Sequence, residues 1–418
     1  MDTVSASIIT IGDELLIGQV IDTNSAWMAQ ELNKIGIPVH RRVAVGDKWD
    51  EIWNALNQES AASNIVLITG GLGPTSDDIT KPLLCEYFGG KLILHQPTLE
   101  HVTCLFEHVF KKGLPLAERN IKQAEVPDNC TILKNELGTA PGMLFEKNGC
   151  LFFSLPGVPH EMQSLIKNEV IPLLQNRFNT GCIEHRTLLT AGIGESMLAD
   201  RLVNFEVNLP QNVSLAYLPN YGMVRLRLTM FGEKTNEVND TINQQFSKLQ
   251  SLVKDVMITD NDEPLEAVIG RLLSEQKKTI ATAESCTGGY ISHLITSIAG
   301  SSAYYEGSII SYSYEVKEKI LHVNKTTLEK YGAVSEEVVT EMVNNALEMM
   351  QTDYAIAVSG IMGPAGGTPD KPVGSVWIAV AGKERLITKK MQFRFNRQRN
   401  IQLTAANALL LMHQLLTD

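Results

Sequence analysis

Short apolar runs that alternate with amphipathic segments restrict the fold of this chain more than any other feature. Residues 7–11 and 65–68 are mostly apolar, as in strands that a sheet buries on both faces. Between them, Asp22-Thr23-Asn24 can cap a helix whose apolar stripe follows the 3.6-residue period. This alternation of strand and helix predicts a mostly parallel sheet with helices on both faces.

The rest of the chain divides into a small module and a second alternating part. Residues 181–258 read as a strand, a short helix, a hairpin and a long polar helix, without a glycine-rich loop of their own. The polar string 259–264 ends in a proline, which is typical of a linker that leads into a helix. We therefore expect an α/β protein with two three-layer α/β domains, 1–180 and 259–418, joined by a small α+β module.

Charge and cysteine usage exclude several classes of function. The 418-residue chain has a formal net charge of −11 and only isolated lysine pairs, so it offers no basic patch to nucleic acid. Its six cysteines show no C-x-x-C spacing, which argues against a zinc site or a disulfide framework and fits a reducing compartment. Neither a signal-peptide pattern nor an apolar run of membrane-span length is found. We expect a cytoplasmic protein without membrane or direct nucleic-acid partners.

The clearest chemical signal follows the apolar run 279–282. Residues 283–289, Ala-Glu-Ser-Cys-Thr-Gly-Gly, indicate a strand that ends in a tight loop before a helix. The backbone N–H groups of such a loop can hold an anion or the oxyanion of a tetrahedral intermediate. Ser285 lies at the head of this loop, where a hydroxyl nucleophile would be needed. Loops of this composition also bind phosphate or form simple turns, and both alternatives stay open.

A serine nucleophile needs a base, and no histidine lies in a suitable pattern. Lys317 follows residues 308–313, a predicted strand that ends in hydroxyl residues. A lysine buried beside such a strand can lose its proton near neutral pH and act as the base, whereas the alternative is an exposed helix lysine. Cys286 is a rival nucleophile, but neighbouring side chains on a strand point to opposite faces, so only one of the two can face a cleft.

A substrate could be bound by two further segments. Residues 359–367 form a glycine-rich loop after a buried strand. Arg397 and Arg399, at the start of the closing helix, can pair with a phosphate, although surface arginines without a ligand are the alternative.

The first part of the chain carries its own glycine-rich loop. Residues 69–78 follow a buried strand and hold three glycines, two threonines and a serine, a composition that can cradle phosphate or pyrophosphate. Asp13 and Asp47 follow two other strands, and with Asp78 they could hold one Mg²⁺-like ion. The alternative is that these acids cap helices.

Two more loops are rich in glycine and proline. Residues 138–142 and 155–159, the latter followed by His160 and Glu161, could line the same cleft as the glycine-rich loop. Each of them alone would be only a turn.

Taken together, these strings resemble the CinA family of competence/damage-inducible proteins over essentially the whole chain. The matching strings are residues 11–16, 22–24, 69–78, 138–142, 155–161, 283–289, 312–317, 332–335 and 359–367.

For the last part of the chain, the resemblance implies a nicotinamide mononucleotide (NMN) deamidase, a Ser/Lys amidohydrolase that needs no metal. Ser285 would be the nucleophile and Lys317 the base, while Tyr312 would relay a proton or orient the substrate. The residues expected to bind substrate are Thr287, Gly288, Gly289, Ser313, Ser359, Gly360, Gly363, Arg397 and Arg399.

For the first part, the resemblance implies a molybdopterin-binding-like fold and metal-dependent cleavage of ADP-ribose, with Mg²⁺ or a similar divalent cation. The expected nucleotide-binding residues are Gly12, Asn24, Thr69, Gly70, Gly71, Gly73, Thr75, Pro141, Gly142, Pro156 and Gly157. The expected metal ligands are Asp13, Asp47, Asp78 and Glu161.

The chain departs from the family pattern at two places. Where the family often has Gly-Asp-Arg, this chain has Phe395-Asn396-Arg397, and its KH-like middle module lacks a G-x-x-G loop, so RNA binding does not follow. Two other functions stay open: a first part that binds a pterin or nucleotide without turning it over, and an accessory factor in DNA uptake or recombination. The net charge of −11 weighs against direct contact with DNA. A homodimer is the expected assembly.

Overall fold

A computed structural model describes residues 4–75, 78–109 and 117–417. The chain divides into two compact units, Met1–His185 with Thr229–Asn243, and Arg186–Leu228 with Gln244–Asp418. No helix in the described ranges is long and apolar enough to cross a membrane.

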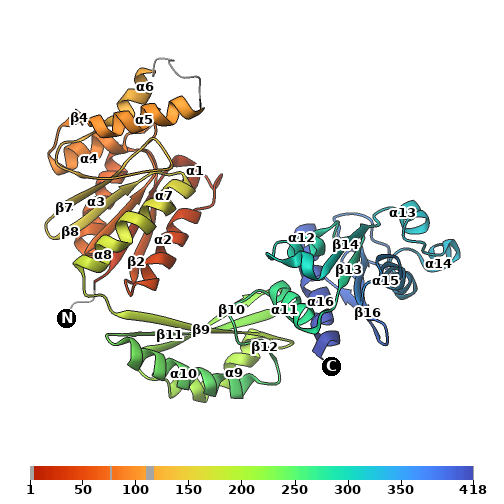
Figure 1. Ribbon diagram of the computed structural model, residues 1–418. Coiled ribbons are helices and arrows are strands. Elements are labelled where there is room, and N and C mark those ends of the chain that lie inside the picture. Colours follow the sequence, from red (N-terminus) through yellow and green to blue (C-terminus); the bar gives the residue numbers. More distant parts are fainter. Residues whose placement is uncertain (1–3, 76–77, 110–116, 418) are drawn as a thin grey trace. The chain divides into compact units, whose positions relative to one another are not determined.

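The first unit is built on a six-stranded sheet of order β2-β1-β3-β8-β7-β6, with helices on both faces (Figure 1). Neighbouring strands from β2 to β8 are parallel, and only β7 runs against the others, because its pairs with β8 and with β6 are both antiparallel. Its elements are β1 Ala6–Ile11, α1 Asp13–Leu16, α2 Thr23–Lys34, β2 Val39–Val45, α3 Trp49–Ala62, β3 Ile65–Thr69, α4 Thr80–Phe88, β4 Leu92–Leu94, α5 Gln96–Val109, α6 Glu118–Ile121, β5 Glu125–Pro127, β6 Thr131–Leu133, β7 Gly142–Lys147, β8 Cys150–Leu155, α7 Pro159–Leu165, a π turn Ile166–Val170 and α8 Ile171–Arg177.

Successive residues of the central strands enter two separate cores. Ile8 and Leu67 pack with α2, α7 and α8, whereas Ile9 and Ile68 pack with α3 and α4. Side chains alternate between the faces of a strand, so an apolar strand can serve helices on both sides. The mostly parallel three-layer arrangement expected for this part is confirmed.

A four-stranded sheet of order β10-β11-β9-β12 follows in the chain. Its elements are β9 Cys182–Ala191, α9 Glu195–Val207, β10 Val213–Asn220, β11 Met223–Gly232, α10 Thr235–Val253 and β12 Met257–Thr259. The predicted order of strand, helix, hairpin and long helix is confirmed, although α9 continues to Val207 rather than ending near Leu202.

The last part contains a five-stranded sheet of order β14-β13-β15-β16-β17. Strand β13 runs parallel to β14 and β15, and the two following pairs are antiparallel. Its elements are α11 Leu265–Gln276, β13 Ile280–Glu284, α12 Tyr290–Thr296, β14 Tyr305–Ile310, α13 Tyr314–Lys319, α14 Lys325–Tyr331, α15 Glu336–Met350, β15 Tyr354–Gly360, β16 Ser375–Gly382, β17 Leu386–Gln392 and α16 Arg397–Thr417.

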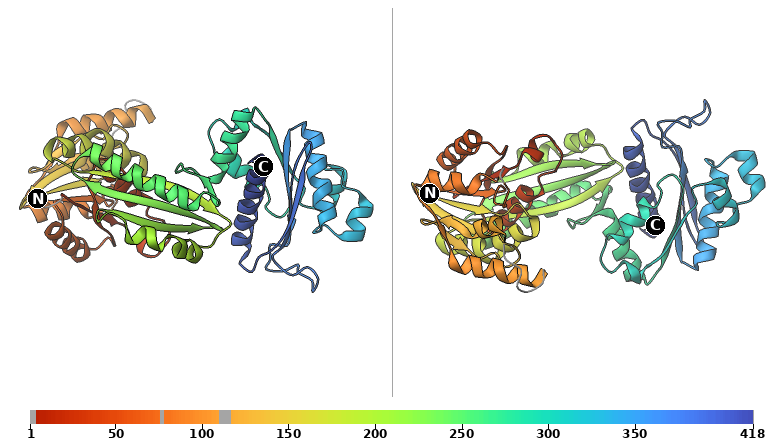
Figure 2. Two further views of the ribbon diagram at one scale, coloured as in Figure 1. Left: turned by 90° about the horizontal axis from the view of Figure 1, so that it is seen from below. Right: turned by 90° about the horizontal axis from the view of Figure 1, so that it is seen from above.

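The two faces of this sheet carry side chains of different size. Ile356 and Val358 pack with α11, α12 and α16, whereas Ala355 and Ala357 pack with α14 and α15. Figure 2 shows the sheet between these two layers of helices, with the dark blue α16 on one side and the lighter helices of residues 325–350 on the other. Small side chains on one face leave room for the valines and methionines of α15.

The contrast between the two faces predicts that neighbouring positions of β15 differ in how well they tolerate substitution. Ala357→Leu inserts methylenes into a filled layer and should lower the free energy of unfolding by about 1–3 kcal/mol. Ile356→Leu keeps the volume on the other face and should cost less than about 1.5 kcal/mol. Urea unfolding of both variants measures the difference, and equal costs would contradict this account of the packing.

Candidate active site

The loop after β13 and the helix after β14 bring Ser285 and Lys317 together. The two strands are parallel neighbours, with Glu284 paired to Ile310 at their carboxyl ends, so the segments that follow them meet at one edge of the sheet. The Lys317 Nζ lies 2.8 Å from the Ser285 Oγ. Ser285 is 7% exposed and Lys317 is 1% exposed, so the pair is almost closed to solvent.

The Lys317 amine also contacts two backbone carbonyls, and burial affects its protonation. Its Nζ donates to the carbonyl oxygens of Ser311, at 2.6 Å, and of Tyr312, at 3.2 Å. As an ammonium, Lys317 can donate to both carbonyls and to the Ser285 hydroxyl oxygen. Once neutral, the amine keeps two N–H groups for the carbonyls, and its lone pair can accept the Ser285 hydroxyl. Burial lowers the pKa of Lys317 to about 8. The geometry therefore allows the amine to accept the serine proton.

Helix α13 begins one residue after Ser313 and buries only its lysine at position 317. The Ser313 hydroxyl accepts the N–H of Val316 at 3.2 Å and so caps the helix. Ser313, predicted to bind substrate, is thus already engaged as a cap. The predicted strand 308–313 is also shorter than expected, because β14 ends at Ile310.

Cys286, the rival nucleophile, lies in the apolar core. It is 5% exposed and packs in the cluster of α11, α12 and α16. Burial raises the pKa of its thiol to about 12, so the reactive thiolate is absent at neutral pH. Of the two neighbours, Ser285 is the one that contacts a base.

The backbone N–H groups predicted to hold an anion are partly occupied within the loop. Gly288 donates to the Ser285 carbonyl at 3.2 Å, and Gly289 donates to the Glu284 carboxylate at 3.0 Å. The Thr287 hydroxyl also donates to that carboxylate, at 2.7 Å. Of the loop residues predicted to bind substrate, Gly288 and Gly289 therefore have backbone N–H groups that already donate within the chain. Within the described part of the chain, the N–H groups of Cys286 and Thr287 have no acceptor.

A second group of predicted residues surrounds this edge of the sheet. Arg397 donates to the Gly363 carbonyl at 2.9 Å and to the Tyr312 hydroxyl at 3.2 Å, so it joins two loops. Arg399 instead lies with its guanidinium 4.4 Å from the centre of the Phe395 ring. Of the two arginines, Arg397 is the one that contacts a predicted catalytic residue.

Ser359 and Gly360 contact neighbouring segments of the chain and do not face open space. The Ser359 hydroxyl donates to the Ala333 carbonyl at 2.6 Å, and Ser359 is 1% exposed. A Cβ on Gly360 would lie 2.9 Å from the Ser375 carbonyl, so this position needs a glycine. Both residues fix the strand end from which the glycine-rich loop starts.

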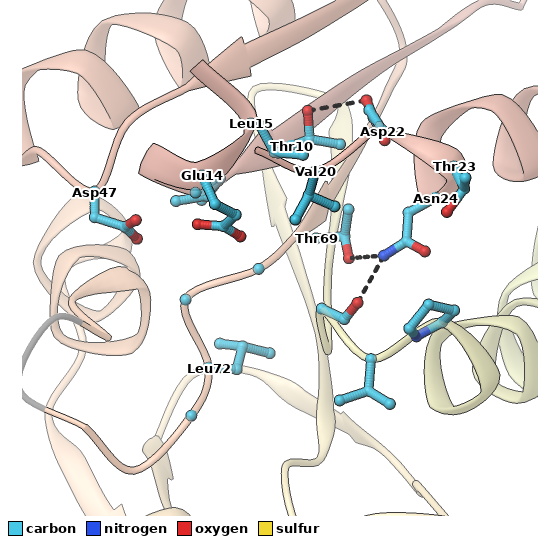
Figure 3. Close-up of a pocket in the computed structure, with 18 of the residues that line it drawn as sticks. Thr10, Glu14, Leu15, Val20, Asp22, Thr23, Asn24, Asp47, Thr69 and Leu72 are labelled. Carbon is cyan, nitrogen blue, oxygen red and sulfur yellow. Dashed lines mark hydrogen bonds between the residues drawn. The ribbon is translucent and has the colours of Figure 1, made fainter. Parts of the chain in front are cut away.

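The first unit contains a cavity of about 420 Å³ at the carboxyl ends of its parallel strands. Its lining includes the predicted residues Gly12, Asn24, Thr69, Gly70, Gly71, Gly73 and Gly157. The amide of Asn24 donates to the Gly157 carbonyl at 2.8 Å and to the Thr69 hydroxyl at 3.5 Å (Figure 3). The Thr69 hydroxyl in turn donates to the Pro156 carbonyl at 2.7 Å. These bonds tie three loops into one cradle.

The acids predicted as metal ligands do not converge. The Asp47 carboxylate accepts the backbone N–H of Asp13 at 3.0 Å, and the Asp13 carboxylate accepts that of Asp47 at 3.3 Å. Only Asp47 of the two lines the cavity. Asp78 lines it too, yet its two oxygens accept the N–H groups of Gly73 and Thr75, both at 2.8 Å. Ser76 and Asp77 of the same loop lie outside the described residues.

Glu161 lies elsewhere and does not line the cavity. It accepts a hydrogen bond from the Asn135 amide at 2.7 Å and lies against Gly138. The described ranges contain no group of three or more His, Cys, Asp or Glu residues that could hold a metal ion. The four predicted acids therefore do not form one cluster of metal ligands in the described residues.

The two Gly/Pro-rich loops line different cavities. Gly157 and Pro159 line the cavity described above, whereas Gly138 and Pro141 line a second one of about 360 Å³. Gly142, the first residue of β7, packs against Leu133 instead. The prediction of one shared cleft is wrong, because the hairpin of β6 and β7 turns the 138–142 loop towards α5.

Sequence patterns alone missed three acids of these sites. Glu14 and Asp22 line the first cavity, and Figure 3 shows Glu14 near Asp47, with Asp22 and Asn24 across the cavity from them. The Glu284 carboxylate accepts the Gly289 N–H and so fixes the loop that contains Ser285. All three lie within the sequence motifs described above, next to predicted site residues, and that proximity is the signal that could have identified them.

Three family models match the chain in succession. They are the probable molybdopterin binding domain at residues 7–176, the damage-inducible protein CinA KH domain at 185–258 and the CinA C-terminal domain at 262–416. The expected fold class, α/β domains with a KH-like module between them, is thereby confirmed.

Full-length relatives and a solved structure are also similar to this chain. A CinA-like protein of Cytophaga hutchinsonii is 46% identical over 99% of this chain and 98% of its own. Another, of Flavobacterium psychrophilum, is 45% identical over 98% of each chain. The crystal structure of the competence damage-inducible protein A of Klebsiella pneumoniae covers 36% of this chain and 93% of its own, with 35% identity and a TM-score of 0.35.

Proposed function

This chain belongs to the CinA family, since a relative 46% identical spans 99% of it, and from that premise we propose that residues 262–416 form a nicotinamide-nucleotide amidohydrolase. The reaction is the hydrolysis of the carboxamide of NMN to nicotinic acid mononucleotide and ammonia. The observation that carries the proposal is the buried Lys317 amine 2.8 Å from the Ser285 hydroxyl. A hydroxyl beside a neutral amine is the arrangement that activates a serine nucleophile without histidine.

The chemistry proceeds in two halves that share the same base. The Ser285 Oγ attacks the amide carbon while Lys317 takes its proton, and collapse of the tetrahedral intermediate breaks the C–N bond. Lys317 returns the proton to the departing nitrogen, which leaves as ammonia. A water molecule then attacks the ester, again with Lys317 as the base, and releases the carboxylic acid and free Ser285.

Arg397 and Tyr312 have the chemistry to orient the substrate beside this pair. Arg397 holds Tyr312 and Gly363 together, and a guanidinium can pair with a phosphate through two parallel hydrogen bonds. Tyr312 is 63% exposed, so its ring is open to a ligand that enters the site. We assign Arg397 to the phosphate of the nucleotide and Tyr312 to its orientation.

Removing either member of the pair should abolish turnover. Ser285→Ala and Lys317→Ala should each lower kcat for NMN by about 10³-fold or more, because the nucleophile and its base act as one unit. Ammonia and nicotinic acid mononucleotide are measured without added metal. Lys319→Ala, which removes an exposed lysine of the same helix, is the matched control and should keep full activity. An unmodified protein that releases no ammonia would refute the proposal.

The activity should rise with pH through the lysine pKa. The base form of Lys317 is the neutral amine, and its fraction grows as the pH rises towards and past about 8. Below that pH, kcat/KM for NMN should increase about tenfold per pH unit and then level off. Initial rates between pH 6 and 9.5 provide the profile. A flat profile, or one that falls over this range, would exclude Lys317 as the base.

For the first unit we propose binding of a nucleoside diphosphate such as ADP-ribose, with cleavage of its pyrophosphate as the associated activity. Support comes from the cavity of about 420 Å³, whose glycine-rich wall can bring backbone N–H groups close to phosphate oxygens. Because the four predicted acids do not form one cluster in the described residues, we assign none of them the role of metal ligand. That same observation favours a second candidate function, binding of a pterin or nucleotide without turnover.

Two glycines offer a matched test of this site. Gly71 lines the cavity with φ +63°, and a Cβ there would lie 2.1 Å from the Thr80 hydroxyl, so Gly71→Ala must displace the loop. Gly89 has φ +73° but open space around it and lies outside the cavity. Calorimetry should show ADP-ribose binding weakened about tenfold or more in Gly71→Ala and unchanged in Gly89→Ala. Equal affinities would place the ligand elsewhere, and product release with Mg²⁺ separates cleavage from binding alone.

A further inference from the structure

A carboxylate with no exposed surface lies directly beneath the loop of Ser285. Glu284 is 0% exposed and is the last residue of β13. One of its oxygens, Oε2, accepts the Thr287 hydroxyl at 2.7 Å and the N–H groups of Gly289 and Ile291 at 3.0 and 3.1 Å. The other, Oε1, accepts the N–H of Ser292 at 2.8 Å. Four donors from the loop and the helix after it thus converge on one side chain.

This carboxylate has no basic partner among the described residues, so its charge is stabilised by these four donors and by the Thr282 hydroxyl, which donates to Oε1 at 3.4 Å. An unpaired charge inside a protein is costly, but a carboxylate that accepts several N–H groups at a helix start is a favourable exception. The N–H groups of Ile291 and Ser292 belong to the first turn of α12. Glu284 therefore joins the end of the strand, the loop and the helix start at one point.

The same bonds determine which loop donors remain for a ligand. The Gly289 N–H already donates to Glu284, and the Gly288 N–H donates to the Ser285 carbonyl. Only Cys286 and Thr287, of the four residues that follow Ser285 in the loop, have a backbone N–H without an acceptor in the described ranges. Both lie next to the nucleophile in the chain, where the oxyanion of an attacked carbonyl would form.

We propose that Glu284 is a positioning residue of the amidohydrolase: it folds the 285–289 loop so that the N–H groups of Cys286 and Thr287 stabilise the oxyanion while Ser285 faces Lys317. This inference rests on the proposed function and adds the oxyanion donors and the group that orients them. Glu284 is fully buried, and its hydrogen bonds go to Thr282, to the loop and to the start of α12 rather than to the side chains of Ser285 and Lys317, so it acts through the loop.

A carboxylate is needed here because every contact to it is a donor. A carboxylate accepts at both oxygens, whereas the amide of glutamine has one acceptor and one NH₂ group. In Glu284→Gln, that NH₂ group would face at least one N–H or hydroxyl and force the loop to shift. The substitution keeps the size of the side chain, so it isolates the loss of the acceptor.

The experiment compares Glu284→Gln with Asp353→Asn in the full chain. Asp353 accepts the Thr279 N–H at 3.1 Å near the opposite end of β13 and lies far in sequence from the loop, so it controls for lost strand anchoring. With NMN, Glu284→Gln should lower kcat about 100-fold and leave KM within about twofold, as expected when oxyanion donors are displaced. Asp353→Asn should lower the melting temperature without changing kcat.

Three results of this comparison would overturn the proposal. One is a folded Glu284→Gln protein whose kcat stays within about threefold of the unmodified value. Another is a KM that rises as much as kcat falls. The last is a parallel loss of kcat and melting temperature in both variants, since that would indicate general destabilisation.

A milder variant decides the question if Glu284→Gln does not fold. Thr287→Val removes one of the hydrogen bonds to the carboxylate and keeps the shape of the side chain. A charge-assisted hydrogen bond of this kind corresponds to roughly a tenfold effect, so kcat should fall about tenfold with KM unchanged. An unchanged kcat would overturn the proposal.

A substrate-independent probe separates failure of this inference from failure of the proposed function. A fluorophosphonate reacts when the Ser285 Oγ forms a bond to phosphorus, fluoride leaves with the P–F electron pair and Lys317 takes the proton. If NMN is not hydrolysed but the unmodified protein is labelled at Ser285, labelling slowed about tenfold or more in Glu284→Gln supports the positioning role with another amide or ester as substrate. Equal labelling rates, or an unmodified protein that is not labelled, would overturn it.

Discussion

Burial of a single amine constrains the whole edge of the last sheet. Lys317 is 1% exposed and forms no ion pair within the described part of the chain, so its charged form would be costly there. The structure meets this cost with two carbonyls and one hydroxyl that converge on the Nζ from the segments after β13 and β14. Each of these segments must be placed accurately for the amine to be satisfied, so nucleophile, base and sheet edge form one unit.

Strand topology explains why part of this site could be predicted from the sequence. Parallel neighbours end at the same edge of a sheet, so a polar loop after one apolar run and a polar segment after the next are brought together. Ser285 stands out because it begins a glycine-rich loop. Lys317 is harder to distinguish from an exposed helix lysine, since α13 is only six residues long and too short to show an amphipathic stripe. Its place after the hydroxyl-rich segment 308–313 made it a candidate base, and the resemblance to a family strengthened that prediction.

What the sequence could not show is where hydrogen bonds are already used. A glycine-rich loop in the sequence indicates accessible backbone N–H groups. Only the folded chain shows that the Gly289 N–H donates to Glu284 and that the Asp78 carboxylate accepts from its own loop. Glu161 belongs to a helix near the first cavity by sequence, yet Asn135 holds it at another loop. The edge strand β6 has only three residues and is partly exposed, so it lacks the apolar run that revealed the parallel strands.

Cys286, one residue from the nucleophile, has a further consequence. Its sulfur is enclosed by the core, and burial raises the pKa of the thiol to about 12, so almost no thiolate forms at neutral pH. Peroxides and electrophiles attack the thiolate rather than the thiol. Oxidants do not react with the Ser285 hydroxyl, and burial keeps the neighbouring Cys286 in its unreactive thiol form. We therefore expect this centre to resist the oxidising conditions that inactivate hydrolases with a cysteine nucleophile.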